Sequence, residues 1–240
     1  MKNIEIEFKK LKRTGIIPLM LVIGFISSFY ALSYFYLRKE SLLSFHMNPT
    51  DVLLNQLYGM TMILNLFAII VSTTLIYKIE LDGAAMKKMY LLPISIGKIY
   101  LSKFIILSLL LAFGIAVEFS AFILIGAVNF GQVFDISKML IFSLYAYITS
   151  MAVLSFMIFI GLFCKNIWTI LGIGVLGFLS AMAFGPSQVT FLIINPFILM
   201  MKPILDMSAN IDLTIFLLSL IEILGFLLTG LIAIKKFNYE

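Results

Sequence analysis

The amino-acid sequence predicts an all-α, polytopic membrane protein with six transmembrane helices in a single domain, residues 1–240. Of the 240 residues, 62% are hydrophobic and only 12% are charged, whereas soluble domains average about 25% charged residues. Such a chain has too few polar side chains to cover a water-exposed surface, but apolar helix faces need no cover in a lipid bilayer. The apolar residues are also grouped into runs long enough to cross a hydrocarbon core of about 30 Å.

Six apolar runs give the expected spans. The first run follows a basic segment, as in a signal peptide, but it is longer than the apolar core of a signal peptide, so we expect a retained helix. The spans are residues 16–37, 53–77, 104–127, 139–163, 167–185 and 212–234.

Residues 1–14 mix basic, acidic and apolar side chains before the first span. Ile4, Phe8 and Leu11 have the spacing of one helix face. Ile6 alternates with its acidic neighbours, which leaves a short strand as the competing prediction. Beside a membrane span, a basic amphipathic helix lying in the headgroup plane is favoured.

Residues 186–211 are apolar but contain Pro186, Pro196 and Pro203. Proline interrupts a helix interior, so we expect no continuous span here. Irregular backbone at membrane depth must be buried in protein or hydrated. The sequence therefore predicts a re-entrant or interfacial hairpin on the outer side, between the fifth and sixth spans.

The distribution of basic residues predicts the orientation. An even number of spans puts both termini on one side, and the positive-inside rule assigns that side to the cytoplasm. Lysine far outnumbers arginine, which is typical of an AT-rich source, so we expect the cell membrane of a Gram-positive bacterium. The basic residues left on the outer side are Arg38, Lys39, Lys138 and Lys202.

The longest polar interruption, residues 79–103, lies on the cytoplasmic side in this topology. Within the coupling loop, residues 79–95, apolar side chains recur at the spacing of one face of a short helix. A surface helix of this kind beside a membrane lies on lipid or binds another protein. The apolar side chains are Ala85, Met86, Met89 and Tyr90.

The motif in this stretch resembles that of a known family. The order of an acidic residue, a glycine, a lysine, Leu-Pro-Ile-Ser and further lysines resembles the permeases of type-2 ABC exporters. More narrowly, it resembles the short permease subunits of lantibiotic (bacteriocin) self-immunity exporters. The chain differs where many relatives have Arg-Gly-Thr, at 82–84, and at 96–97, where they have a basic residue. The matching residues are Glu80, Gly83, Lys87, Pro93, Ser95 and Lys103.

The resemblance implies that the loop binds a separate ATPase subunit. A working exporter would contain two ATPase subunits, which bind ATP and Mg²⁺, and a second permease that is a homologous subunit or a copy of this chain. Its cargo would be a membrane-active peptide antibiotic, so the implied role is lantibiotic immunity or antibiotic resistance. The expected docking residues are Glu80, Asp82, Gly83, Ala84, Lys87, Met89, Tyr90 and Pro93.

The remaining motifs argue against other classes of protein. No Walker A pattern is present, so the chain is not expected to be an enzyme or to hold a cofactor of its own. A G-x-G-x-x-G pattern from Gly172 to Gly177 lies inside an apolar span with no preceding strand, which excludes a dinucleotide site. A single cysteine and a single histidine do not suffice for a metal site. Orientation in a membrane explains the positive charge better than nucleic acid does.

Two carboxyl groups lie inside spans, at Glu118 and Glu222. A charged side chain at the centre of a bilayer costs at least about 2.5 kcal/mol, so it faces a cavity or a partner. Both are expected about 15 Å from the outer surface, at 1.5 Å per residue, where they would meet a cationic substrate or bind protons. The alternative is two protonated acids, hydrogen-bonded at helix contacts. They also motivate a rival function, a gradient-driven ion or small-solute transporter.

Overall fold

The computed structural model describes residues 2–11, 14–44, 48–81, 96–186, 190–205 and 209–237. Every element in these ranges is helical, and six of the described helices are long and apolar enough to cross a membrane. The all-α prediction with six spans is therefore confirmed. These helices are α2 (Ile16–Leu37), α4 (Pro49–Leu81), α6 (Ile96–Phe130), α7 (Ile136–Phe163), α8 (Ile167–Phe184) and α10 (Leu213–Phe237).

The second and third spanning helices extend beyond the apolar runs that are expected to cross the membrane. α4 has 33 residues and α6 has 35, which at 1.5 Å per residue makes each about 50 Å long. A hydrocarbon core of about 30 Å cannot contain such helices, so they tilt or extend into the headgroup layer and water. The extra turns carry charged residues that the hydropathy pattern assigned to loops.

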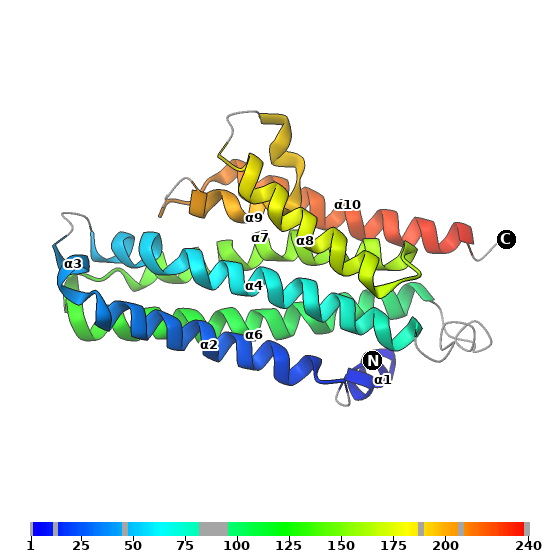
Figure 1. Ribbon diagram of the computed structural model, residues 1–240, viewed down its shortest axis with the longest axis horizontal. Coiled ribbons are helices and arrows are strands. Elements are labelled where there is room, and N and C mark those ends of the chain that lie inside the picture. Colours follow the sequence, from blue (N-terminus) through cyan, green and yellow to red (C-terminus); the bar gives the residue numbers. More distant parts are fainter. Residues whose placement is uncertain are drawn as a thin grey trace.

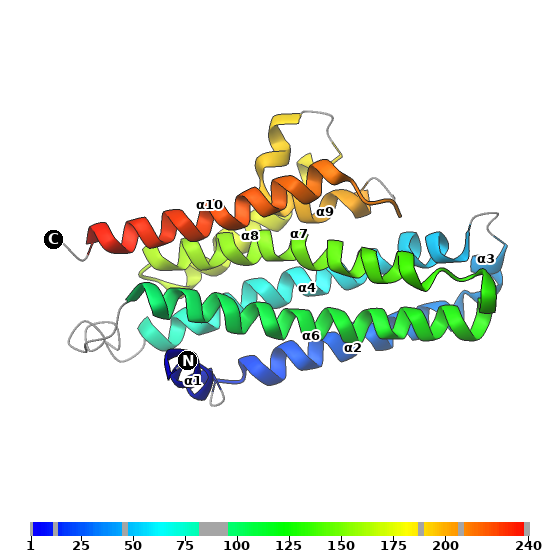
Figure 2. The ribbon, with the colours of Figure 1, turned by 180° about the vertical axis from the view of Figure 1, so that it is seen from behind.

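The helices form an elongated bundle with α4, α6 and α7 at its centre (Figures 1 and 2). At least half of the most apolar window of each central helix is buried, against less than a third in α2, α8 and α10. α2 packs on α4 and α6, α8 packs on α4, and α10 packs mainly on α7. The three peripheral helices therefore present most of their apolar surface outward.

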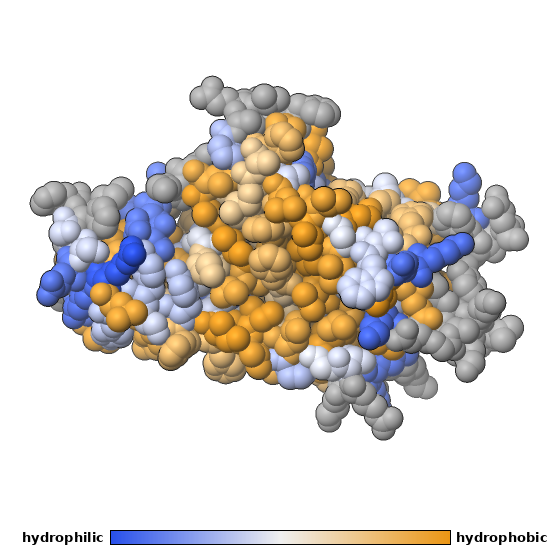
Figure 3. All heavy atoms as spheres, in the orientation of Figure 1, coloured by the Kyte–Doolittle hydropathy of each residue, from blue (hydrophilic) through white to orange (hydrophobic). Residues whose placement is uncertain are grey.

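The two ends of the bundle differ from its middle. Figure 3 shows an apolar band around the middle of the long axis, with hydrophilic residues at both ends. α1 (Lys2–Leu11), the end of α4, the start of α6 and the end of α10 share one end, called the loop end here (Figure 1). The protein is thus a multi-pass membrane protein, with α1 and the C-terminal end of α10 at the same end of the bundle.

At the opposite end, polar contacts join α4 to the start of α7. Lys138 Nζ binds Asp51 Oδ1 at 2.5 Å. The Thr50 hydroxyl accepts a hydrogen bond of 2.9 Å from the Asp135 backbone amide, and Asp135 caps α7 by accepting from the Lys138 amide. Two short elements complete this end, α3 (Lys39–Leu43) and the 3₁₀ turn η2 (Gly131–Val133).

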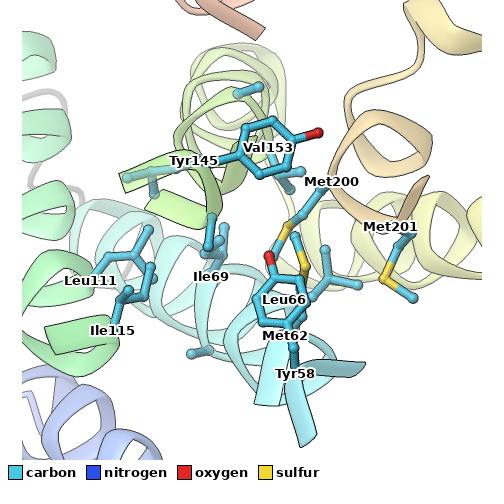
Figure 4. Close-up of a cluster of buried hydrophobic side chains, with 14 of the residues drawn as sticks. Tyr58, Met62, Leu66, Ile69, Leu111, Ile115, Tyr145, Val153, Met200 and Met201 are labelled. Carbon is cyan, nitrogen blue, oxygen red and sulfur yellow. The ribbon is translucent and has the colours of Figure 1, made fainter. Parts of the chain in front are cut away.

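The described part of residues 186–211 contains two short helices, η3 (Thr190–Ile194) and α9 (Pro196–Leu205), rather than a span. α9 packs on α7 and α8, and its Met200 and Met201 lie in a buried cluster with side chains of α4 and α7 (Figure 4). Asn195 caps α9 and donates to Ser180 Oγ at 3.0 Å. The described part of this segment forms two short helices and not one continuous helix, as the prolines predict; its re-entrant placement in a membrane stays a prediction.

Two of the three glycines of the G-x-G-x-x-G pattern serve helix packing. A Cβ atom added to Gly174 would lie 2.6 Å from the Ile70 side chain, and one added to Gly177 would lie 2.4 Å from the Phe197 ring. Both glycines therefore make room for a neighbouring helix.

Candidate functional site at the base of the loop 82–95

An ion pair joins the two helices that flank residues 82–95. Lys103 Nζ of α6 binds Glu80 Oε2 of α4, and the two side chains are only 3% and 6% exposed. The second carboxyl oxygen, Glu80 Oε1, is buried with no hydrogen-bond partner in the described part of the chain. Breaking a buried pair by removing one partner is strongly destabilising, so this contact fixes α4 and α6 side by side at the loop end.

Tyr77 extends the same contact to α7. Its ring lies under the Lys103 ammonium, 4.3 Å from the nitrogen to the ring centroid. Its hydroxyl donates a hydrogen bond of 2.7 Å to the Ile158 backbone oxygen. The ring fits because residue 161 is glycine, where a Cβ atom would lie 2.1 Å from it. The ion pair is therefore tied to a third helix.

α1 covers this cluster from the outside of the bundle. It is helical, as the sequence predicts, and packs on α6 with Leu11 and Glu7 buried. Glu7 binds Lys10 within the same helix, and both residues also interact electrostatically with Lys103. Two carboxylates thus meet two ammonium groups, so opposite charges are balanced, and of the four groups only Lys10 is partly exposed. The interfacial placement of α1 in a headgroup layer stays a prediction.

α10 is attached to the loop end by a separate contact. The Tyr100 hydroxyl of α6 donates a hydrogen bond of 3.1 Å to the Phe226 backbone oxygen of α10. Gly230 permits this approach, since a Cβ atom there would lie 2.5 Å from the Tyr100 hydroxyl. Four helices of the bundle, α4, α6, α7 and α10, are therefore linked near the loop by side-chain hydrogen bonds or ion pairs.

Most of the expected docking residues lie outside the described residues. Only Glu80 falls within them, and it is buried against Lys103. The sequence singled out both residues as part of a motif but did not pair them with each other. Tyr77 was missed, although an aromatic residue one turn before a buried acid is compatible with a cation above its ring. The other expected docking residues, outside the described ranges, are Asp82, Gly83, Ala84, Lys87, Met89, Tyr90 and Pro93.

The two intramembrane carboxyl groups have separate surroundings. Glu118 is 1% exposed, and its Oε2 accepts a hydrogen bond of 2.8 Å from Asn65 Nδ2 of α4. Glu222 lies on α10, where both carboxyl oxygens are buried and have no hydrogen-bond partner in the described part of the chain. No hydrogen bond or electrostatic interaction connects the two groups. Neither a shared substrate site nor shared proton binding is demonstrated by this arrangement.

Comparison with known proteins gives a family for the chain. No curated protein and no solved structure matches it. The model of the family described as ABC-2 family transporter protein matches residues 3–181, which include nearly all of α1, the charged ends of α4 and α6, the first four spanning helices and most of α8. This match covers well over half of the 240 residues. The chain therefore belongs to the ABC-2 transporter family, as a membrane-spanning permease subunit of an ABC transporter.

Proposed function

We propose that the chain is the permease of an ATP-driven exporter that removes a membrane-active peptide antibiotic of the lantibiotic class from the cell membrane. The family match over residues 3–181 carries the transporter part of the proposal. The lantibiotic part rests on the loop motif from Glu80 to Lys103, which is similar to that of immunity permeases. In this proposal, both termini and the loop lie in the cytoplasm of a Gram-positive bacterium.

The base of the loop supports a mechanical role. An ATPase subunit would bind residues 82–95 and push or pull on the ends of α4 and α6. Because the Glu80–Lys103 pair and Tyr77 join these helices to α7, such a force would move the three central helices together. Two ATPase subunits would supply the force by binding ATP and Mg²⁺, as in other ABC transporters.

A second permease, homologous or identical, would complete the translocation path. The peripheral α2 and α8 expose large apolar side chains such as Phe25, Phe29 and Leu176. One of these two exposed helix faces would contact the second permease, and the other would contact lipid. The cargo would enter from the bilayer and leave near the outer segment that contains α9.

The test is to express the chain together with an ABC ATPase subunit from the same organism and to measure protection of the cells against a lantibiotic. Cysteine at Met89 is expected to crosslink to the ATPase, whereas cysteine at Val133, an exposed residue at the opposite end, is the matched control. An inactive ATPase should abolish protection. Full transport by the purified chain without any ATPase would overturn the proposal and favour a gradient-driven transporter that uses Glu118 and Glu222.

A further inference from the structure

A buried polar group of three side chains lies between α2, α4 and α6. It consists of Ser27, Asn65 and Glu118, which are 0%, 5% and 1% exposed, and is called the Glu118 group here. Asn65 Nδ2 binds one carboxyl oxygen of Glu118 at 2.8 Å. The Ser27 hydroxyl faces the same carboxyl group, yet Ser27 Oγ and Glu118 Oε1 lack a hydrogen bond of acceptable geometry to any described residue.

Ser27 differs from the other serine and threonine hydroxyl groups buried in the described helices. Nearly all of those donate to a carbonyl oxygen of their own helix, as the adjacent Ser28 does to Gly24 O at 2.9 Å. The exception besides Ser27 is Thr50, which accepts from a backbone amide. A buried hydroxyl without a partner is destabilising, so the position of Ser27 points to Glu118 as its partner.

Close packing of two backbones brings this serine within reach. Gly24, three residues before Ser27, lies against Gly114, four residues before Glu118; a Cβ atom on Gly24 would be 3.0 Å from Gly114 Cα. Residues three or four apart share one helix face. The glycine contact therefore places Ser27 and Glu118 on facing surfaces at the closest approach of α2 and α6.

No cation among the described residues interacts with Glu118. The titratable groups facing it are the hydroxyl of Tyr58 on α4 and, beyond it, that of Tyr145 on α7. An ionised carboxylate here would hold an uncompensated charge inside a membrane span, which is expensive. A neutral carboxylic acid avoids that cost and adds an O–H donor, which the lone pairs of Ser27 Oγ can accept.

We propose that the Glu118 group is a proton-binding site within the membrane. Glu118 carries one proton, and its carboxyl O–H donates a hydrogen bond to Ser27 Oγ. Asn65 donates a hydrogen bond to the other carboxyl oxygen. The neutral acid thereby joins α2 to both α4 and α6. This inference does not depend on the cargo or on ATPase binding, because it concerns only the packing of the first three spans.

Infrared difference spectroscopy on the purified protein tests the proton directly. Subtracting the spectrum of Glu118→Gln from that of the wild type at neutral pH cancels Glu222 and all other carboxyl groups. An exposed glutamate is ionised at this pH, because its pKa is about 4.3. The expected difference is a carbonyl band of a protonated acid, present only in the wild type. A difference confined to carboxylate bands would overturn the proposal.

Two adjacent serines give a matched pair of variants for the hydrogen bond. Ser27→Ala is expected to shift the acid band and to lower the midpoint of thermal unfolding in detergent by about 2–4 °C, the shift that ~1 kcal/mol causes in a chain of this size. Ser28→Ala should change neither, since Ser28 bonds within its own helix. Equal effects of the two variants would contradict a bond between Ser27 and Glu118.

Transport measurements then separate a held proton from an ion pathway. Gln is neutral and offers both a donor and an acceptor, so Glu118→Gln should retain protection of the cells, whereas Glu118→Ala should lose it. Loss of protection in a correctly folded Glu118→Gln variant would show that the charge is needed, and would overturn the proposal without affecting the ATPase-driven function.

Discussion

At the scale of single residues, Lys103 is the side chain on which the loop end most depends. One ammonium group binds Glu80, lies over Tyr77 and interacts with Glu7. A lysine 3% exposed is tolerated only because these partners replace its water. Each partner in turn depends on Lys103, so the loss of Lys103 costs more stability than any one of its contacts contributes.

We expect Lys103→Met to destabilise the protein by about 3–5 kcal/mol, because it leaves Glu80 buried and unpaired. The double variant Lys103→Met, Glu80→Leu should recover most of that loss, since an apolar pair of similar volume is often no less stable than a buried ion pair. The measurement is the midpoint of thermal unfolding in detergent. A double variant no more stable than the single one would show that the loss in Lys103→Met does not come from the unpaired charge of Glu80.

The sequence identified these residues individually but not as partners. Glu80 and Lys103 were recognised as polar interruptions, and Glu118 as a buried acid that needs a partner. The ion pair between Glu80 and Lys103 joins α4 to α6 across residues 82–95. The hydrogen bond between Asn65 and Glu118 joins the same two helices over a longer separation in the sequence. No local spacing encodes such pairs; they follow from the antiparallel packing of the helices, which periodicity alone does not determine.

At the scale of helices, the contact between α2 and α6 brings two backbones directly together. A Cβ atom on Gly24 would meet Gly114 Cα at 3.0 Å and Gly114 O at 3.2 Å, and neither backbone atom can rotate away. A substitution of Gly114 meets less resistance, because a Cβ atom there would lie 3.8 Å from Met20 O, an ordinary contact. Small residues of this kind allow helices to approach closely in lipid.

Gly24→Ala is therefore expected to cost about 1–3 kcal/mol, the usual penalty for overpacking, and Gly114→Ala should cost clearly less. Thermal unfolding of the two variants in the same detergent measures the difference. If both alanines were equally tolerated, α2 and α6 would have to be further apart in solution than the structure places them.

The sequence predicts the existence of the spanning helices better than their length. α2 runs from Ile16 to Leu37, where the apolar run itself begins and ends. α4 and α6 extend beyond their apolar runs because the charged residues at their ends, Glu80 and Lys103, neutralise each other inside protein. A hydropathy pattern treats every charge as if it faced lipid, so it does not show how far these helices extend beyond the apolar runs.

At the scale of the whole molecule, an apolar band separates two hydrophilic ends (Figure 3). Basic residues are concentrated at the loop end, on α1, at the ends of α4 and α10, just after α7 and at the start of α6. Short basic segments beside spanning helices are retained in the cytoplasm. The bundle should therefore be inserted with its loop end inward, where an ATPase can reach residues 82–95.

Cysteine labelling in intact cells measures this orientation. With Cys164 replaced by serine, cysteine at Lys165, an exposed residue between α7 and α8 at the loop end, should react with a membrane-impermeant maleimide only after permeabilisation. Cysteine at Val133, 69% exposed at the opposite end, should react in intact cells. The reverse pattern would place the loop outside the cell, beyond reach of ATP. An ABC-2 permease in that orientation could not be driven through this loop, so the proposed mechanism, and not the helical fold, would have to be abandoned.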